Sequence, residues 1–142
     1  MQDDGDRNLE AVLARAQAAV ADLATNFAKS AVVDLEHCAA FLKTAREQPA
    51  ARAASVKEIY GIAHNLKGQG TSFGYPLITR IGQSLCLLTR PERGFSDADL
   101  GVIQGHLDAI RLILAKDIKG EGGAVGDKLA ARLETLVTQA NA

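Results

Sequence analysis

The sequence predicts an all-α protein: an antiparallel four-helix bundle with additional N- and C-terminal helices. Alanine and leucine, both strong helix formers, dominate a chain that is 47% hydrophobic, so an aliphatic core can be buried. Apolar residues recur at helical spacing in every long segment, and no segment alternates as a strand does. Short stretches with proline or glycine separate these segments.

The first part of the chain predicts two helices after a short tail. Residues 1–7 are polar, and we expect them to be disordered. Apolar stripes predict one helix over about 8–22 and a longer one over about 23–47, and the two can be continuous because Thr25-Asn26 is only a weak break. Gln48-Pro49 ends this stretch, since the residue before a proline resists the α conformation.

The middle of the chain predicts two more helices joined by a tight turn. Apolar residues spaced by four, three, four and three predict a core-facing helix over about 51–73. Gly74-Tyr75-Pro76 follows as a turn, because glycine can end one helix and proline can start the next. The second helix then runs over about 76–90.

The last two helices follow a loop at 91–94. Ser96 and Asp99 resemble a capping box that starts a helix reaching to about 118. We therefore assign 8–119 to the bundle with its N-terminal helix, and 120–142 to a glycine-rich break and a C-terminal helix.

Charge and composition exclude several classes of function. With 16 basic and 17 acidic residues, the net charge of −1 gives no general attraction to nucleic acid or to an anionic membrane. We expect a cytoplasmic protein, because no signal peptide and no apolar run of about 20 residues is visible. Cys38 and Cys86 stand alone in helical patterns, which favours buried free thiols, and no metal site is expected because zinc needs four convergent ligands.

The residues able to carry chemistry lie in the third predicted helix. Each helical residue advances about 100°, so His64, Lys67, Gly68 and Thr71 share one outward-facing patch when the apolar stripe points inward. Gly68 has no packing reason to be a glycine there, and it clears space for another surface to reach His64. Gly70 lies on the inward stripe, where a neighbouring helix can come close.

His64 and Lys67 suit nucleophilic chemistry at phosphorus. An exposed imidazole is largely neutral and nucleophilic near neutral pH. Lys67, one turn further along, stays cationic and can stabilise a phosphoryl group attached to His64. Neither a hydrolytic triad nor an ATP-binding motif is indicated.

The pattern of His64, Lys67 and Gly68, with Gly74 ten residues after the histidine, resembles the motif of the histidine-containing phosphotransfer (HPt) family. The run from Gly70 to Gly74, Gly-Thr-Ser-Phe-Gly, is similar to the phosphoacceptor domain of chemotaxis histidine kinases. The resemblance covers about residues 20–119, as helix order plus one motif.

The resemblance implies a phosphocarrier with no turnover of its own. In a two-component phosphorelay, His64 would accept a phosphoryl group from the receiver domain of a hybrid histidine kinase and pass it to the receiver aspartate of a response regulator. No cofactor is implied for this chain, because the required Mg²⁺ belongs to the receiver. We expect a monomer that binds neither nucleic acid nor membrane.

The resemblance also implies a polar residue on the following helix that hydrogen-bonds His64 Nδ1 and leaves Nε2 to attack. The family's usual position holds Cys86, a poor hydrogen-bonding group, so Gln83 is the better candidate and Thr79 a third. Gly74 is expected to be structural. Partner docking is expected from a face around the histidine that includes Tyr60, Thr71, Phe73, Tyr75, Thr79, Arg80, Cys86 and Leu87.

Two alternatives use the same surface. The first is a non-phosphorylated helical adaptor that docks receiver domains, whose binding would survive loss of His64. The second is the phosphoacceptor portion of a chemotaxis-type kinase assembly, which a partner kinase would label directly from ATP.

Overall fold

Five α-helices account for most of residues 4–142, which are the residues that the computed structural model describes, and no strand occurs among them. The helices are α1 (Asp4–Glu47), α2 (Arg52–Gly70), α3 (Pro76–Leu88), α4 (Asp97–Ala115) and α5 (Gly123–Ala140), with short 3₁₀ helices η1 (Pro49–Ala51) and η2 (Thr71–Phe73) at the two ends of α2. The all-α prediction is confirmed over this range. No helix in it is long and apolar enough to cross a membrane.

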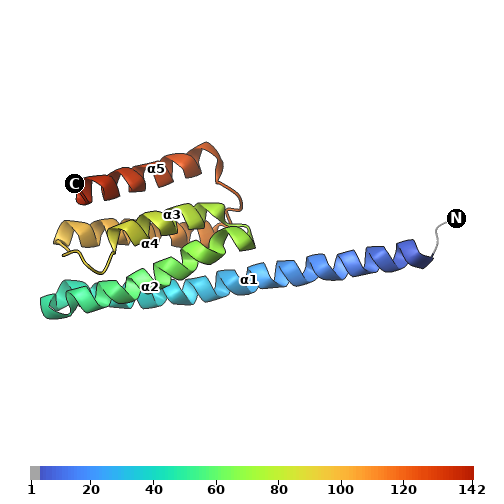
Figure 1. Cartoon of the computed structure of the whole chain (residues 1–142), viewed down its shortest axis with the longest axis horizontal. Helices are drawn as coiled ribbons and strands as arrows, with labels where there is room; N and C mark the ends of the chain where they lie inside the picture. Colours follow the sequence, from blue (N-terminus) through green and yellow to red (C-terminus); the bar gives the residue numbers. More distant parts are fainter. Residues whose placement is uncertain (1–3) are drawn as a thin grey trace.

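Successive helices run in opposite directions and pack side by side (Figure 1). Helix α1 contacts α2, α2 contacts α3, α3 contacts α4, and α4 contacts α1, so these four helices form a closed ring. Helix α5 packs against α3 and α4, on the side away from α1. The largest fully buried side chains are leucines and isoleucines of α1 to α4, so the core lies inside the ring.

Helix α1 is one continuous helix of 44 residues, which is the alternative that the weak break at Thr25-Asn26 left open. Thr25 does not interrupt it, because its hydroxyl donates to the Ala21 carbonyl at 3.1 Å and stays within the helix. The helix also starts early. Residues 4–7, expected to be disordered, are helical, and 1–3 lie outside the described residues.

Only the C-terminal half of α1 belongs to the packed body. Phe27 is its first buried residue, whereas every residue from Asp4 to Leu23 is exposed. In Figure 1 this outer half of α1 projects away from the other helices towards the N-terminus. The buried positions of the inner half continue through Ala31, Leu35, Cys38, Leu42 and Ala45.

The link between α2 and α3 requires glycine at one position. η2 ends at Gly74, whose φ of 91° lies in the left-handed region that a side chain disfavours. The Gly74 carbonyl accepts a hydrogen bond from the Gly120 N–H at 3.1 Å, and Pro76 then opens α3. Gly74 therefore ends the helix and also anchors the segment before α5.

Helix α4 begins with a capping box and carries a buried histidine. Ser96 Oγ accepts from the Asp99 N–H at 3.1 Å, and the Asp99 carboxylate accepts from the Ser96 N–H at 2.9 Å.

His106 is fully buried: Nδ1 donates to the Val102 carbonyl at 2.7 Å, and Nε2 accepts from the Ser84 hydroxyl at 2.8 Å. This network fits the neutral ring, and burial lowers the pKa of His106.

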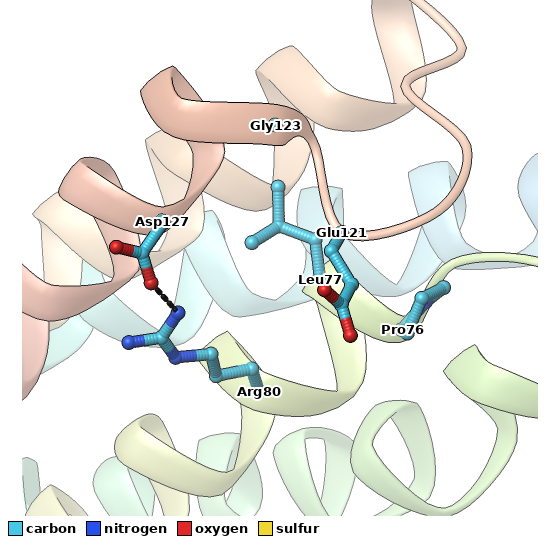
Figure 2. Close-up of a pocket in the computed structure, with 6 residues that line it drawn as sticks. All are labelled: Pro76, Leu77, Arg80, Glu121, Gly123 and Asp127. Atoms are coloured by element: carbon cyan, nitrogen blue, oxygen red, sulfur yellow. Dashed lines mark hydrogen bonds and ion pairs between the residues drawn. The ribbon is translucent and has the colours of Figure 1, made fainter.

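Helix α5 is held on α3 by Arg80. The Arg80 guanidinium lies 2.7 Å from a carboxylate oxygen of Asp127 and 2.7 Å from one of Glu134. Figure 2 shows Arg80 reaching from α3 to Asp127 of α5, beside Leu77. Because these pairs are partly exposed, each contributes little alone, and burial of Leu133 adds the apolar part of the contact.

We expect the stability of the fold to decrease as pH falls below about 6.5, because His106 is buried in its neutral form. Its pKa in the folded chain lies below that of an unfolded histidine, so acid protonates the unfolded chain first and favours unfolding. The stabilisation from the neutral His106 ring is complete when the pH is above the pKa of this residue in the unfolded chain. It is lost as the pH falls through the pKa of His106 in the folded chain.

Urea unfolding at about pH 7.5 and about pH 5.5 measures this effect. The wild-type chain should lose free energy of unfolding at the lower pH, and His106→Gln, although less stable at pH 7.5, should lose less. His37→Gln removes an exposed histidine and should behave as wild type. An unchanged pH dependence in His106→Gln would contradict the prediction.

Candidate functional site

His64 lies on the exposed face of α2. Its ring lies beside that of Tyr60, with the centroids 6.3 Å apart. No residue among 4–142 makes a hydrogen bond or an ion pair with it. A shallow hollow of about 570 Å³ lies along this face and is lined by Glu58, Tyr60, Gly61, Ile62, His64 and Asn65. The imidazole is therefore open to a visiting molecule.

Two exposed glycines flank His64 on α2. Gly68 follows it by four residues and Gly61 precedes it by three, so the two glycines, seven residues apart, share one face of the helix. A Cβ atom at either position would meet nothing within 4 Å, so packing inside the chain requires neither glycine. The sequence prediction omits Gly61, although the spacing argument that selects Gly68 also selects it.

On its inner side, α2 comes into backbone contact with α3. A Cβ atom on Gly70 would lie 2.7 Å from Thr79 Oγ1 and 2.9 Å from the Tyr75 carbonyl oxygen. A Cβ atom on Gly82 of α3 would lie 3.1 Å from the Lys67 backbone nitrogen. Residues without a side chain permit this approach, and Gly70 faces inward as its place on the apolar stripe predicts.

Lys67 is a half-buried cation near the contact between α2 and α3. None of the ion pairs within residues 4–142 includes it. The Lys67 backbone and Cβ lie against Gly82 of α3. Burial raises the pKa of the Cys86 thiol on α3, and the charge of Lys67 partly opposes this rise. Its charge, one turn from His64, remains available for an anion.

No hydrogen bond joins His64 to any of the three residues considered as its orienting partner. Thr79 is committed elsewhere: its Oγ1 accepts from both the N–H and the hydroxyl of Thr71, each at 2.8 Å. Thr79 therefore closes the C-terminal end of α2 and does not orient the imidazole.

The alignment of α2 with α3 brings Cys86, and not Gln83, level with His64. Lys67 lies against Gly82 in this antiparallel pair. One turn further along, the same register places Cys86 level with His64 and leaves Gln83 level with Lys67. Cys86 is only 7% exposed, whereas Gln83 is exposed.

The residues expected to dock a partner differ widely in exposure. Thr71 is exposed; Tyr60, Phe73, Thr79, Arg80 and Leu87 are half-buried; Tyr75 and Cys86 are buried. The expected docking role of the last two needs correction, because a buried side chain cannot meet a partner without a rearrangement. Arg80 likewise is engaged by α5 through its two ion pairs.

The two aromatic residues after α2 pack inside the chain. Phe73 stacks on Phe27 of α1 with ring centroids 5.1 Å apart, and Tyr75 lies 5.9 Å from the same Phe27 ring. The Tyr75 hydroxyl donates to Asp117 at 2.6 Å, and the Lys119 ammonium lies 4.0 Å from the centre of the Tyr75 ring. Burial raises the pKa of Tyr75, and its hydrogen bond lowers the pKa of Asp117. Contacts with Phe27 of α1 thus help to leave Phe73 only half exposed and Tyr75 buried.

The chain matches no protein-family model, and no curated protein or solved structure is significantly similar to it. Within residues 4–142, no group of three or more His, Cys, Asp or Glu side chains could hold a metal ion.

Alanine at Gly70 and at Gly68 should change stability in opposite directions. Gly70→Ala forces a Cβ atom against backbone atoms of α3 and should lower the free energy of unfolding by about 1–3 kcal/mol. Gly68→Ala adds a helix-favouring residue in open space and should raise it by up to about 1 kcal/mol. Urea unfolding of both variants measures the difference. Equal effects would show that the inward and outward assignments are wrong.

Proposed function

We propose that this chain is a histidine phosphotransfer protein of a two-component phosphorelay. His64 accepts a phosphoryl group from a receiver aspartate of a hybrid histidine kinase and donates it to the aspartate of a response regulator. We interpret the ring of α1 to α4 as the antiparallel four-helix bundle of such proteins, with the outer half of α1 and α5 as additions. The observation that carries the proposal is an exposed His64 with bare backbone on both sides and an unpaired cation one turn away.

The charges around His64 support phosphoryl transfer over other chemistry. A phosphorylated imidazole carries negative charge on three oxygens, and Lys67 offers a positive charge that no carboxylate of the described chain neutralises. Among residues 4–142, no carboxylate, serine, cysteine or second histidine forms a hydrogen bond or an ion pair with the ring, which lies beside Tyr60. This setting favours holding a phosphoryl group over activating water against it.

The transfer step balances without an added reactant. The Nε2 lone pair of neutral His64 attacks the phosphorus of an aspartyl phosphate, and the N–P bond forms as the O–P bond to the aspartate breaks. The carboxylate leaves with the electron pair, while Nδ1 keeps its proton. Transfer to the second receiver reverses these changes. Mg²⁺ is expected on the receiver and not on this chain.

The bare backbone of α2 supports a macromolecular partner. A receiver presents its aspartate inside a pocket, so the surface around that pocket must come close to the helix that carries His64. Gly61 and Gly68 remove the side chains that would otherwise hold the two surfaces apart. In-line attack needs the reacting atoms within about 3.5 Å, which makes this clearance matter for rate.

Incubation with phosphorylated receiver domains should label the wild-type chain with an acid-labile, base-stable phosphate. His64→Gln should abolish the label, because glutamine has no nucleophilic nitrogen. His37→Gln is the matched control, since His37 is an exposed histidine on α1, and it should be labelled as wild type is. Label is measured as radioactivity retained by the chain.

Two outcomes would contradict the proposal. If His64→Gln still takes up label, another residue is the acceptor. If no receiver labels the wild-type chain but receivers bind both the wild-type chain and His64→Gln with equal affinity, the adaptor alternative is correct. Direct labelling from ATP by a partner kinase, with no receiver present, would favour the chemotaxis-type alternative.

Filling the bare face should slow transfer without harming the fold. Gly68→Gln places a side chain between α2 and the partner, and we expect the rate of phosphoryl transfer to fall by about 10-fold or more. Gly101→Gln is the matched control, because Gly101 is also an exposed helical glycine with nothing within 4 Å, but it lies on α4. Equal transfer rates in the two variants would argue against a partner approaching along Gly68.

A further inference from the structure

The outer half of α1 carries an apolar stripe that no other part of the described chain covers. Leucine and valine side chains here are 51–61% exposed, namely Leu9, Val12, Leu13, Val20 and Leu23. With Ala16, the positions 9, 13, 16, 20 and 23 follow the alternating spacing of four and three that marks the contact seam of paired helices. Surface leucines are ordinary when scattered, but a continuous seam indicates an interface.

Most helices in proteins owe more of their stability to packing of an apolar face than to the helix propensity of their residues. Asp4–Leu23 is exposed throughout and projects beyond the bundle (Figure 1). A second apolar surface packed against the seam would supply the packing that the rest of the described chain does not.

The charge of the outer half of α1 argues against an anionic membrane as the surface that packs on the seam. The polar face of a membrane-surface helix is rich in lysine and arginine. The segment 4–23 instead holds more acidic than basic side chains: Asp4, Asp6, Glu10 and Asp22 against Arg7 and Arg15. An acidic segment of this kind is repelled by anionic lipid.

We propose that the outer half of α1 pairs with the same segment of a second copy of this chain, in antiparallel orientation. A half-exposed leucine or valine presents roughly 100 Å² of apolar surface, so Leu9, Val12, Leu13 and Val20 of two copies would cover on the order of 800 Å². Ala16 and the alkyl parts of flanking side chains bring the contact towards about 1,000 Å², the lower bound for a specific interface. This departs from the monomer expected from the sequence. It does not depend on the proposed function of His64.

The antiparallel orientation follows from where the bundle lies on α1. At 100° per residue, the seam of the outer half and the buried stripe from Phe27 to Ala45 point to the same side of the helix, within about 40°. The other helices occupy that side beyond Phe27 (Figure 1). In a parallel pair, each helix would run into the bundle of its partner, whereas an antiparallel pair places the two bundles at opposite ends.

The same constraint selects one register. In an antiparallel pair, a seam residue that follows a spacing of four in one helix faces one that follows a spacing of three in the other. Leu13 therefore faces Ala16 of the second copy, and Leu9 faces Val20 of the second copy. A large side chain then faces a small one at the centre. The register shifted by seven residues would need Phe27 in the seam, but Phe27 is only 6% exposed and packs on Phe73.

Sedimentation equilibrium of the full chain at about 100 µM tests the pairing, since a dimer of micromolar Kd is saturated there. We expect twice the mass of one chain. Leu13→Asp combined with Val20→Asp puts charges in the seam and should weaken association about 100-fold or more. The control combines Ala11→Asp with Ala18→Asp, the same charges at the same spacing on the opposite face, and should remain dimeric.

Spin-label distances between copies test the orientation. Labels on Ala11→Cys, Ala18→Cys and Thr25→Cys all lie on the face opposite the seam. In the proposed register, the two copies of one labelled residue are offset along the helix axis by about 10 Å at positions 11 and 18, and by about 30 Å at position 25. A parallel pair would give no such increase. Cys38 will not take the label, because burial raises the pKa of its thiol to about 12, and Cys86 is also buried.

Four results would overturn the proposal: a monomeric wild-type chain at this concentration, a dimer unaffected by the seam variant, a dimer lost equally in the control, or equal label distances at the three positions. Binding of the monomer to vesicles of anionic phospholipid would assign the seam to a membrane instead. Because His64 lies on the separate face of α2, phosphoryl labelling of the seam variant shows whether the proposed function stands independently of this result.

Discussion

The close backbone contact between α2 and α3 is the constraint on which the rest of the site depends. Gly70 and Gly82 allow the two helices to approach until backbone atoms touch. That contact fixes their register, holds the Lys67 backbone against Gly82 of α3, and leaves His64 on the exposed face of α2. The site is thus a consequence of helix packing, and its own side chains make few contacts with one another.

Much of the fold follows from periodicity and capping in the sequence. Ser96 and Asp99 start α4 as a capping box, and Pro76 starts α3. The sequence left open whether the first stretch is one helix or two, because Thr25-Asn26 is only a weak break. The structure shows one helix, in which the Thr25 hydroxyl donates to a carbonyl of the preceding turn. The early start of α1 could not be foreseen, since polar residues at a helix N-terminus have the composition of a disordered tail.

The candidate site was predictable where one helix defines it and not where several do. The outward position of His64 and Gly68 needs only the rotation per residue along α2. The burial of Tyr75 depends on α1, on Asp117 and on Lys119, which are distant in sequence, so the residues around the turn carried no signal of it. Gly61 did carry a signal, the same helical spacing that singles out Gly68.

The continuity of α1 has a mechanical consequence. The helix contains neither glycine nor proline between Asp6 and Glu47, so it has no built-in hinge. Its first described turn stands about 35 Å beyond Phe27 along the axis. Because the helix is stiff, a small tilt of the packed body produces a large displacement at the N-terminal end of α1. The position of that end therefore depends sensitively on the orientation of the packed body.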